Sequence, residues 1–292
     1  MLNPVIKDLK KNKLISSKNI HVISKNVRNN KNVKVLYDKQ SKIIFLEKFV
    51  TGKGHFEKQR IYENNKKFNL VINGKKRNLP RLNDDLRRVK QFKKFTKNKI
   101  LCDYGCGDGN FINRIKNAKN RFALDINIYN SKFFKKKGVK FIKSLSEIDT
   151  NLNIIFMFHS LHYMPYQIDI LKKIRNKLSN NGMIIIEVPH ANDFLLQSKM
   201  TTQFKDFSFH VENLVWHTKK SLEKFLKVAG FKKIKVSFFQ RYDLNNHLNW
   251  ILNKNDKLKQ VKYIKDNQKI FQYKKKLINL GLTDTLIATA KK

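Results

Sequence analysis

The chain has few of the residues that mark metal-bound proteins. It holds only two cysteines, Cys102 and Cys106, with ten glycines and four prolines in 292 residues. Two sulfurs cannot form a structural zinc site unaided, and no pair of histidines lies nearby at the spacing of a zinc finger. We therefore predict no metal site and interpret both cysteines as small structural residues.

Long apolar runs are also missing. Runs such as residues 184–186 are far too short to cross a bilayer, and the first thirty residues contain no continuous apolar stretch of the kind found in secretory signals. We expect no membrane span and a cytoplasmic protein. Hydrophobic residues still make up 41% of the chain, which is enough to build a buried core.

Acidic residues are scarce. Only 22 of them face 63 lysines and arginines, which gives a formal net charge of +41. Such an excess is typical of proteins that bind nucleic acid, anionic membranes or phosphorylated substrates. The lysines occur throughout the chain rather than in one tract, so we interpret most of the charge as a surface bias. A phosphate-bearing small substrate is compatible with it, and nucleic acid is the less favoured partner.

The pattern along the chain predicts two parts. We predict that residues 1–80 form a small basic N-terminal module. Within it, residues 1–30 are expected to form a loosely attached lead-in, and residues 33–46 a β-hairpin with a turn at 38–41. Residues 81–292 predict the main domain, with a helical insertion at about 240–281. We find no internal repeat.

The main domain alternates between strand and helix patterns. A helix is predicted at 84–97, capped by Asn83 or Asp84. Further helices are predicted at 110–118, 129–137, 167–178 (closed by residues 180–182) and 218–229, and strands at 100–104, 122–126, 139–142, 153–158, 183–188, 231–239 and 283–290. This order predicts an α/β fold with a doubly wound, mostly parallel, seven-stranded sheet covered by helices on both faces.

A glycine-rich turn lies between the first strand and the helix that follows it. Residues 100–111 read Ile-Leu-Cys-Asp-Tyr-Gly-Cys-Gly-Asp-Gly-Asn-Phe, and Asp125 ends the next strand. Glycines let backbone amides approach a nucleotide-like ligand closely, and open α/β sheets bind such ligands at the carboxyl ends of their strands. A carboxylate at Asp125 can accept both hydroxyl hydrogens of an adenosine ribose.

The spacing of this turn distinguishes between two classes of cofactor. A dinucleotide site would have its third glycine at position 110, where this chain has Asn110, and it would lack an acid at Asp103. The pattern D-x-G-x-G-x-G resembles the class I S-adenosylmethionine-dependent methyltransferases, which have a Rossmann-like fold. The resemblance covers roughly residues 84–290 and implies a cofactor site made of Asp103, Gly105, Cys106, Gly107, Gly109, Asp125, Ile126 and His159, with Asp103 on the amino group of the methionine part and Asp125 on the ribose.

Within that family, the chain most resembles enzymes of surface-polysaccharide and sugar-nucleotide loci. The resemblance rests on the segments 84–89, 187–193, 218–231 and 283–288, which read DDLRRV, EVPHAND, TKKSLEKFLKVAGF and TDTLIA. It implies methyl transfer to a sugar or sugar nucleotide. The zinc cysteines that often accompany the N-terminal hairpin in sugar C-methyltransferases are absent. Asn213 replaces a histidine of an aromatic-x-Glu-His stretch, and Tyr163 stands where a histidine often follows the fourth strand.

Methyl transfer needs a nucleophile aligned with an activated methyl group, and a hydroxyl or carbon nucleophile needs a base. Histidine suits this role near neutral pH. The candidates on loops at the ligand end of the sheet are His159, His162, His190 and His210, with Glu212 as an alternative base or as an orienting group. Arg241 could pair with a phosphate or carboxylate, but we interpret it as an ordinary surface arginine.

Two other functions stay open at this point. The charge and the basic N-terminal module favour an RNA methyltransferase, although residues 159–162 lack the Asn/Asp-Pro-Pro-aromatic motif of enzymes that act on amino groups of nucleic acids. The replaced histidines favour a cofactor-binding scaffold without activity. Fold class cannot decide among these, because one fold hosts many substrates.

Overall fold

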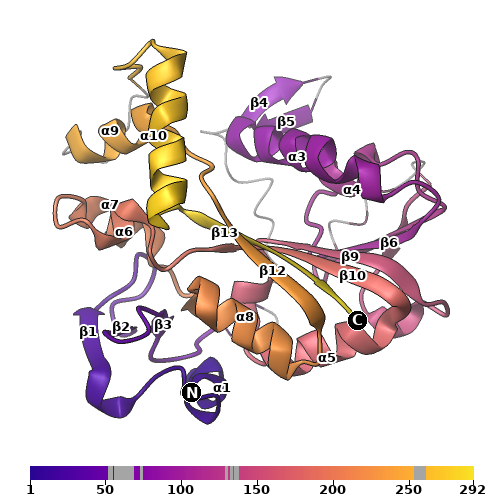
Figure 1. Ribbon diagram of the computed structural model, residues 1–292, viewed down its shortest axis with the longest axis horizontal. Helices are drawn as coiled ribbons and strands as arrows, with labels where there is room; N and C mark the ends of the chain where they lie inside the picture. The colour runs from indigo at the N-terminus through magenta and orange to yellow at the C-terminus, as the bar shows by residue number, and fades with distance from the viewer. Residues whose placement is uncertain are drawn as a thin grey trace.

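The computed structural model describes residues 1–51, 55, 69–72, 75–128, 131, 134, 138–252 and 261–292. Most of the helix predicted at 129–137 lies outside the described residues. A seven-stranded sheet forms the centre of the molecule (Figure 1), in the order β12-β13-β10-β9-β6-β7-β8. Its strands in chain order are β6 (Ile100–Tyr104), β7 (Asn120–Leu124), β8 (Lys140–Ile142), β9 (Leu152–Phe158), β10 (Leu178–Pro189), β12 (Lys232–Phe239) and β13 (Thr285–Lys291).

Only β13 runs antiparallel to its neighbours in this sheet, and the pairs from β10 to β8 are parallel. The predicted α/β fold with a mostly parallel sheet is therefore confirmed. The strand order reverses beside β6, which has β7 on one side and β9 on the other. Such a reversal opens a crevice at the carboxyl ends of the strands, where ligands of α/β proteins bind.

Helices cover both faces of the sheet (Figure 1). One face carries α3 (Leu79–Phe92) and α4 (Asn110–Arg114), and the other carries α5 (Gln167–Lys177) and α8 (Lys219–Val228). Side chains of β9 alternate between the two cores: Phe156 packs against Phe111 on the α4 side, whereas Met157 belongs to the opposite core. The sheet is therefore buried on both faces, which explains its continuous apolar strands.

Several predicted boundaries are wrong. Helix α3 begins at Leu79, so Asp84 lies inside it and is not its cap. Helix α4 ends at Arg114, four residues early. Residues 180–182 belong to β10, which starts at Leu178 directly after α5 and shifts register before Met183.

The N-terminal residues form a second sheet, in the order β1-β2-β3-β11. The strands are β1 (Ile20–Ser24), β2 (Val35–Asp38), β3 (Ile44–Leu46) and β11 (Val215–Trp216), with α1 (Val5–Lys11) packed beside them. The predicted hairpin is confirmed as β2 and β3. The predicted loose lead-in is wrong, because Val5, Ile6 and Leu9 of α1 are buried. Strand β11 comes from the main domain, so the two parts share this sheet.

The remaining elements are short strands, helices and turns outside the two larger sheets. They are β4 (Asn69–Ile72), β5 (Lys75–Asn78), α6 (Phe194–Gln197), α7 (Thr202–Ser208), α9 (Leu244–Leu252) and α10 (Asn267–Leu280), together with short 3₁₀ turns at 17–19, 93–95, 145–147 and 161–163. Helices α9 and α10 fall within the range of about 240–281 that is predicted as a helical insertion. No helix in the described part of the chain is long and apolar enough to span a membrane.

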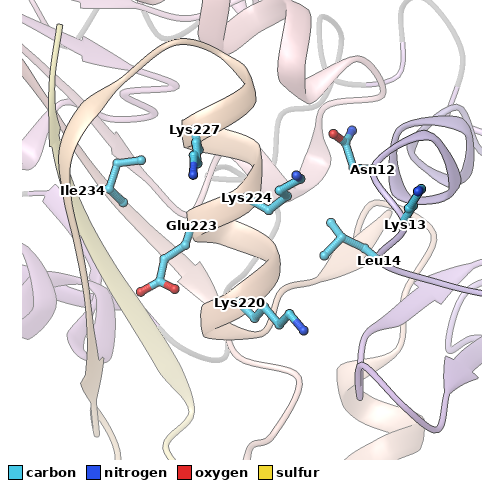
Figure 2. A pocket seen from close by; sticks show the side chains of 8 residues that line it. All are labelled: Asn12, Lys13, Leu14, Lys220, Glu223, Lys224, Lys227 and Ile234. Carbon is cyan, nitrogen blue, oxygen red and sulfur yellow. The ribbon is translucent and has the colours of Figure 1, made fainter.

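A groove of about 370 Å³ lies between the end of α1 and α8 (Figure 2). Lys13 and Asn12 line it on the α1 side, and Lys220 and Lys224 extend toward them from α8. None of the predicted site residues lines this groove. It is one expression of the lysine-rich surface that the composition predicts.

Candidate functional site

The glycine loop follows β6 and turns the chain sharply. Gly105, Gly107 and Gly109 have φ angles of 78°, 55° and 67°, in the left-handed region that favours glycine. A Cβ atom on Gly105 would lie 2.5 Å from Cβ of Ser160, so the loop after β9 packs directly on the glycine loop. The hydroxyl of Ser160 also donates to the carbonyl of Tyr104 at 2.9 Å. The two loops therefore form one surface at the carboxyl edge of the sheet.

Asp125 follows β7 and reaches back to the glycine loop. Its Oδ2 accepts from the N–H of Gly107 at 2.8 Å, and its Oδ1 accepts from the N–H of Asn127 at 2.9 Å. These bonds fix the carboxylate beside the turn, where it can also accept from ribose hydroxyls. Ile126, the next residue, presents an apolar side chain that is 48% exposed. A fixed acceptor beside an exposed apolar side chain and a glycine turn fits the adenosine part of S-adenosylmethionine.

The acid and the thiols of the motif are buried. Asp103 is 4% exposed at the end of β6. Burial, and next to it the charge of Asp103, raises the pKa of both Cys102 and Cys106 well above the usual value, so both thiols are neutral. This agrees with their interpretation as small structural residues. Among the described residues, no group of three or more histidines, cysteines and acids is arranged to hold a metal ion.

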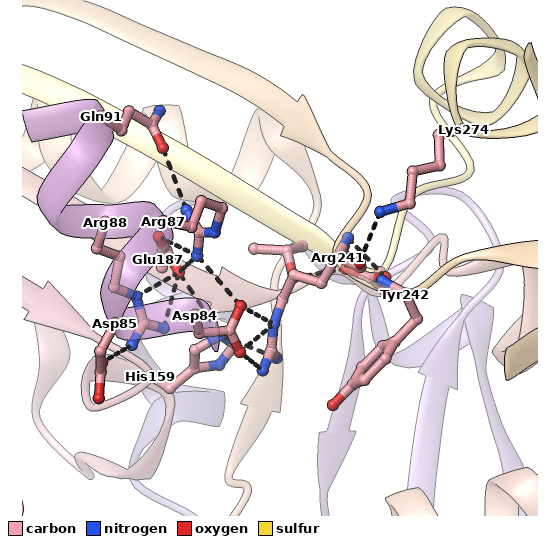
Figure 3. Close-up of polar contacts among 12 residues, drawn as sticks. Asp84, Asp85, Arg87, Arg88, Gln91, His159, Glu187, Arg241, Tyr242 and Lys274 are labelled. Atoms are coloured by element: carbon pink, nitrogen blue, oxygen red, sulfur yellow. Dashed lines mark hydrogen bonds and ion pairs between the residues drawn. The ribbon is translucent and has the colours of Figure 1, made fainter. Parts of the chain in front are cut away.

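A network of arginines and acids lies beside these loops (Figure 3). Arg87 and Arg88 of α3 both donate to the carboxylate of Glu187 on β10, at 2.9 Å from Nη2 in each case. Arg88 also donates to Asp85 at 2.9 Å, and Arg241 pairs with Asp84. Glu187 is fully buried, so two guanidinium groups surround a carboxylate that water does not reach. We call these six residues the arginine network.

Sequence reasoning missed this network. The interpretation of Arg241 as an ordinary surface arginine is wrong: its side chain is 19% exposed and binds both Asp84 and His159. Burial alone would raise the pKa of Asp84, but attraction to Arg241 lowers it below its usual value, so the pair is ionised. The run of opposite charges at residues 84–88 was a visible signal, but nothing in the sequence connected it to position 241 or 187.

Arg241 fixes the state of His159, which follows β9 with a φ of 51°. Nη1 of Arg241 lies 3.2 Å from Nε2 of His159. A guanidinium only donates, so Nε2 accepts, and the proton of the neutral ring is on Nδ1. Burial, followed by the charges of Arg241 and Arg88, lowers the pKa of His159 well below its usual value. His159 therefore presents a donor rather than a base beside the glycine loop.

His162 lies in the next turn and is 1% exposed. Its Nδ1 is buried and has no hydrogen-bond partner among the residues that the structure describes. Burial, followed by the nearby His210 and His217, lowers its pKa well below the usual value, so the ring is neutral. An unpaired buried nitrogen costs about 1–3 kcal/mol, which a bound hydroxyl or water would relieve.

His210 and Glu212 form a hydrogen-bonded pair in the loop between α7 and β11. Nδ1 of His210 lies 2.7 Å from Oε2 of Glu212. Burial raises the pKa of Glu212, but hydrogen bonds from His210 and His55 outweigh it and lower the pKa to about 2. An ionised carboxylate only accepts, so His210 donates from Nδ1, and the lone pair of its neutral ring is on Nε2. This is the arrangement that orients a histidine base.

The structure brings three of the predicted histidines into one row. Ring centroids of His159 and His162 are 5.8 Å apart, Tyr163 lies 4.1 Å from His162, and His210 lies 6.3 Å from Tyr163. We call these four residues, three histidines and one tyrosine, the imidazole row. It begins at the loop that packs on the glycine loop and ends at the His210–Glu212 pair. The row therefore leads from the glycine loop to a group that can act as a base.

His190 is not part of this row. It is 1% exposed, and its Nδ1 lies 2.9 Å from the carbonyl oxygen of Thr283. Burial lowers its pKa to about 4, so the ring is neutral and holds the end of β10 against the start of β13. His217 is also buried between Ser221 and Gln167. Both histidines have structural partners, which separates them from the imidazole row.

Comparison with known proteins agrees with this geometry. A family model described as a methyltransferase domain matches residues 76–236, more than half of the chain. No curated protein matches. The chain belongs to this methyltransferase family, and its cofactor is S-adenosylmethionine.

One solved structure supports the fold, and a second is reported beside it. A SAM-dependent methyltransferase from Archaeoglobus fulgidus is 20% identical, with a TM-score of 0.52 over 73% of this chain and 94% of that one. A SAM-dependent methyltransferase from Thermotoga maritima, described as a possible histamine N-methyltransferase, is 14% identical, with a TM-score of 0.48 over 73% of this chain and 91% of that one. At these identities the likeness concerns the fold alone.

Proposed function

We propose that this methyltransferase transfers the methyl group to a hydroxyl of a sugar or sugar nucleotide, with His210 as the base. The observation that supports this most is the imidazole row, because it extends from the cofactor loop to a histidine oriented by an ionised glutamate. The cofactor residues would be Asp103, Gly105, Cys106, Gly107, Gly109, Asp125, Ile126 and His159.

When bound, S-adenosylmethionine supplies a methyl group activated by a sulfonium. Nε2 of His210 would take the proton of the acceptor hydroxyl as the new O–CH₃ bond forms and the S–CH₃ bond breaks. The products are the methyl ether, S-adenosylhomocysteine and a protonated His210, which returns its proton to solvent. Glu212 stabilises the imidazolium, and Nδ1–H of His159 donates to an oxygen of the bound ligands.

Two features support a sugar nucleotide as the acceptor. The segments 84–89, 187–193 and 283–288 resemble those of enzymes from surface-polysaccharide loci. The first two carry five residues of the arginine network, and the third carries Asp284, which accepts from the N–H groups of Arg241 and Tyr242. The chain is also strongly cationic, which favours an acceptor that bears phosphate.

The test is methyl transfer from labelled S-adenosylmethionine to a panel of sugar nucleotides, with transfer RNA as a second class of acceptor. His210→Gln should lower turnover by roughly 10²–10⁴-fold while cofactor binding is unchanged. His21→Gln, at an exposed position of β1, is the matched control. Methylation of RNA alone would overturn the sugar proposal, and wild-type turnover by His210→Gln would overturn the base. Cofactor binding without any turnover would favour the scaffold reading.

A further inference from the structure

Glu212 is held from two directions. His210 lies on one side, and two residues from the N-terminal part of the chain lie on the other. Nε2 of His55 is 3.0 Å from Oε1, and Nδ2 of Asn29 donates to Oε2 at 3.2 Å. These contacts join residues that are 157 and 183 positions apart in the chain. The carboxylate that orients the proposed base is therefore shared by the two parts of the molecule.

Asn29 is itself fixed in place. Its Oδ1 accepts from the N–H of Val211 at 3.0 Å, while its amide nitrogen faces Glu212. The side chain thus bridges the backbone and the carboxylate of the same loop. The two opposite contacts also determine which end of the amide is oxygen, because an N–H faces one end and a carboxylate the other.

The segment around Asn29 follows the His210 loop along its length. The N–H of Arg28 donates to the carbonyl of Phe209 at 2.8 Å, and the guanidinium of Arg28 lies 4.8 Å from the ring centroid of Phe207. Just after the loop, β11 pairs with β3. The loop that carries His210 and Glu212 is therefore attached to the N-terminal residues before, within and after the pair.

We propose that Asn29 and His55 are positioning residues that hold Glu212 so that His210 keeps its proton on Nδ1 and its lone pair on Nε2. This rests on the proposed role of His210 as base. Without the two N-terminal donors, Glu212 keeps, among the described residues, only the bond from His210 and one from its own backbone N–H. Its side chain, with three rotatable bonds, then turns toward solvent. His210 then exchanges between its two neutral tautomers, one of which cannot accept a proton at Nε2.

The direct test is nitrogen NMR of the His210 ring at a pH where it is neutral, which requires neither cofactor nor acceptor. Wild-type protein should show the Nδ1–H tautomer alone. A signal from the Nε2–H tautomer should appear in Asn29→Ala and in His55→Ala, and it should be strongest in the double variant. His55→Gln keeps a donor toward Glu212 and should restore most of the Nδ1–H signal. Asn19→Ala, which removes an exposed bond to Gln40 in the same module, should leave the spectrum as in wild type.

Turnover supplies the second readout. The double variant should lose roughly tenfold in kcat, with the Kd for S-adenosylmethionine unchanged, since only the orientation of the base is lost. A pure Nδ1–H signal in the double variant would overturn the inference. The His210→Gln variant tests the proposed function separately. Wild-type turnover by His210→Gln would show that His210 is not the base, even if the tautomer of His210 shifts in the double variant as described.

Discussion

At the scale of single residues, the region around the glycine loop combines groups that are close in the chain with pairs that join distant positions. The glycine loop and Asp125 can be proposed from the sequence because strand, turn and acid follow one another within 25 residues. The role of Arg241 was missed because its partner Asp84 lies 157 residues away. His162 and His210 could be proposed as candidates, but only the fold shows that one is buried and the other paired with Glu212.

From the arginine network we expect that neutralising Glu187 strongly lowers the stability of the folded chain. Glu187→Gln leaves the buried guanidinium of Arg88 and the partly exposed one of Arg87 without their shared counter-charge, so the free energy of unfolding should fall by about 3 kcal/mol or more. Urea unfolding at neutral pH measures this. The matched control is Glu223→Gln, whose exposed pair with Lys219 spans 4.0 Å and should change stability by less than about 1 kcal/mol. Equal urea midpoints for the two variants would contradict the account.

At the scale of elements, the central strands of the main sheet were predicted because they contain short apolar runs bounded by polar residues, as in β9 and β10. The edge strand β12 instead mixes lysines with apolar residues. Helix α1 was missed because seven residues are too few to show a distinct period, and burial of Val5, Ile6 and Leu9 stabilises the helix instead. The pairing of β11 with β3 was also beyond prediction, since two residues give no strand signal. The corrected ends of α3 and β10 are ordinary boundary errors.

Hydrogen bonds of Asn3 join the N-terminal residues to the segment before β11. Its Nδ2 donates to the carbonyls of Leu46 and Leu214, both at 2.9 Å, and the residue is fully buried. Asn3→Ala leaves both carbonyls without this donor, so we expect a loss of about 2 kcal/mol and faster amide exchange in β11. Urea unfolding and hydrogen exchange measure the two effects. Asn19→Ala, at an exposed position of the same module, should change neither the stability nor the exchange rate. If amide exchange in β11 of Asn3→Ala is as slow as in wild type, the bonds of Asn3 do not hold the two parts together.

At the scale of the whole molecule, buried histidines make stability depend on pH. Burial lowers the pKa of His190 and His247 to about 4 and of His217 to about 3. The unfolded chain takes up protons at these residues below pH 6.5, whereas the folded chain does not. Stability is therefore fully present above pH 6.5 and falls as the pH drops toward 4.

Protonation of each of these histidines in the unfolded chain should lower the free energy of unfolding by about 2 kcal/mol between pH 6.5 and pH 5. Urea midpoints measured from pH 7.5 to pH 5 should fall steadily, and His217→Gln should show a shallower fall than wild type. His21→Gln, on the surface of β1, should follow the wild-type curve. A midpoint that stays constant across this range would mean that these rings are not buried as described.

The cofactor site is the central claim, and calorimetric binding of S-adenosylmethionine to wild type and to Asp125→Ala tests it most directly. Wild-type protein should bind the cofactor, and the variant should bind at least roughly tenfold more weakly, because it loses a charged acceptor for the ribose. The loop also loses the bond from the N–H of Gly107, so circular dichroism should confirm that the variant is folded. Equal affinity of the two folded proteins, or no binding by wild type, would contradict the site described for this methyltransferase.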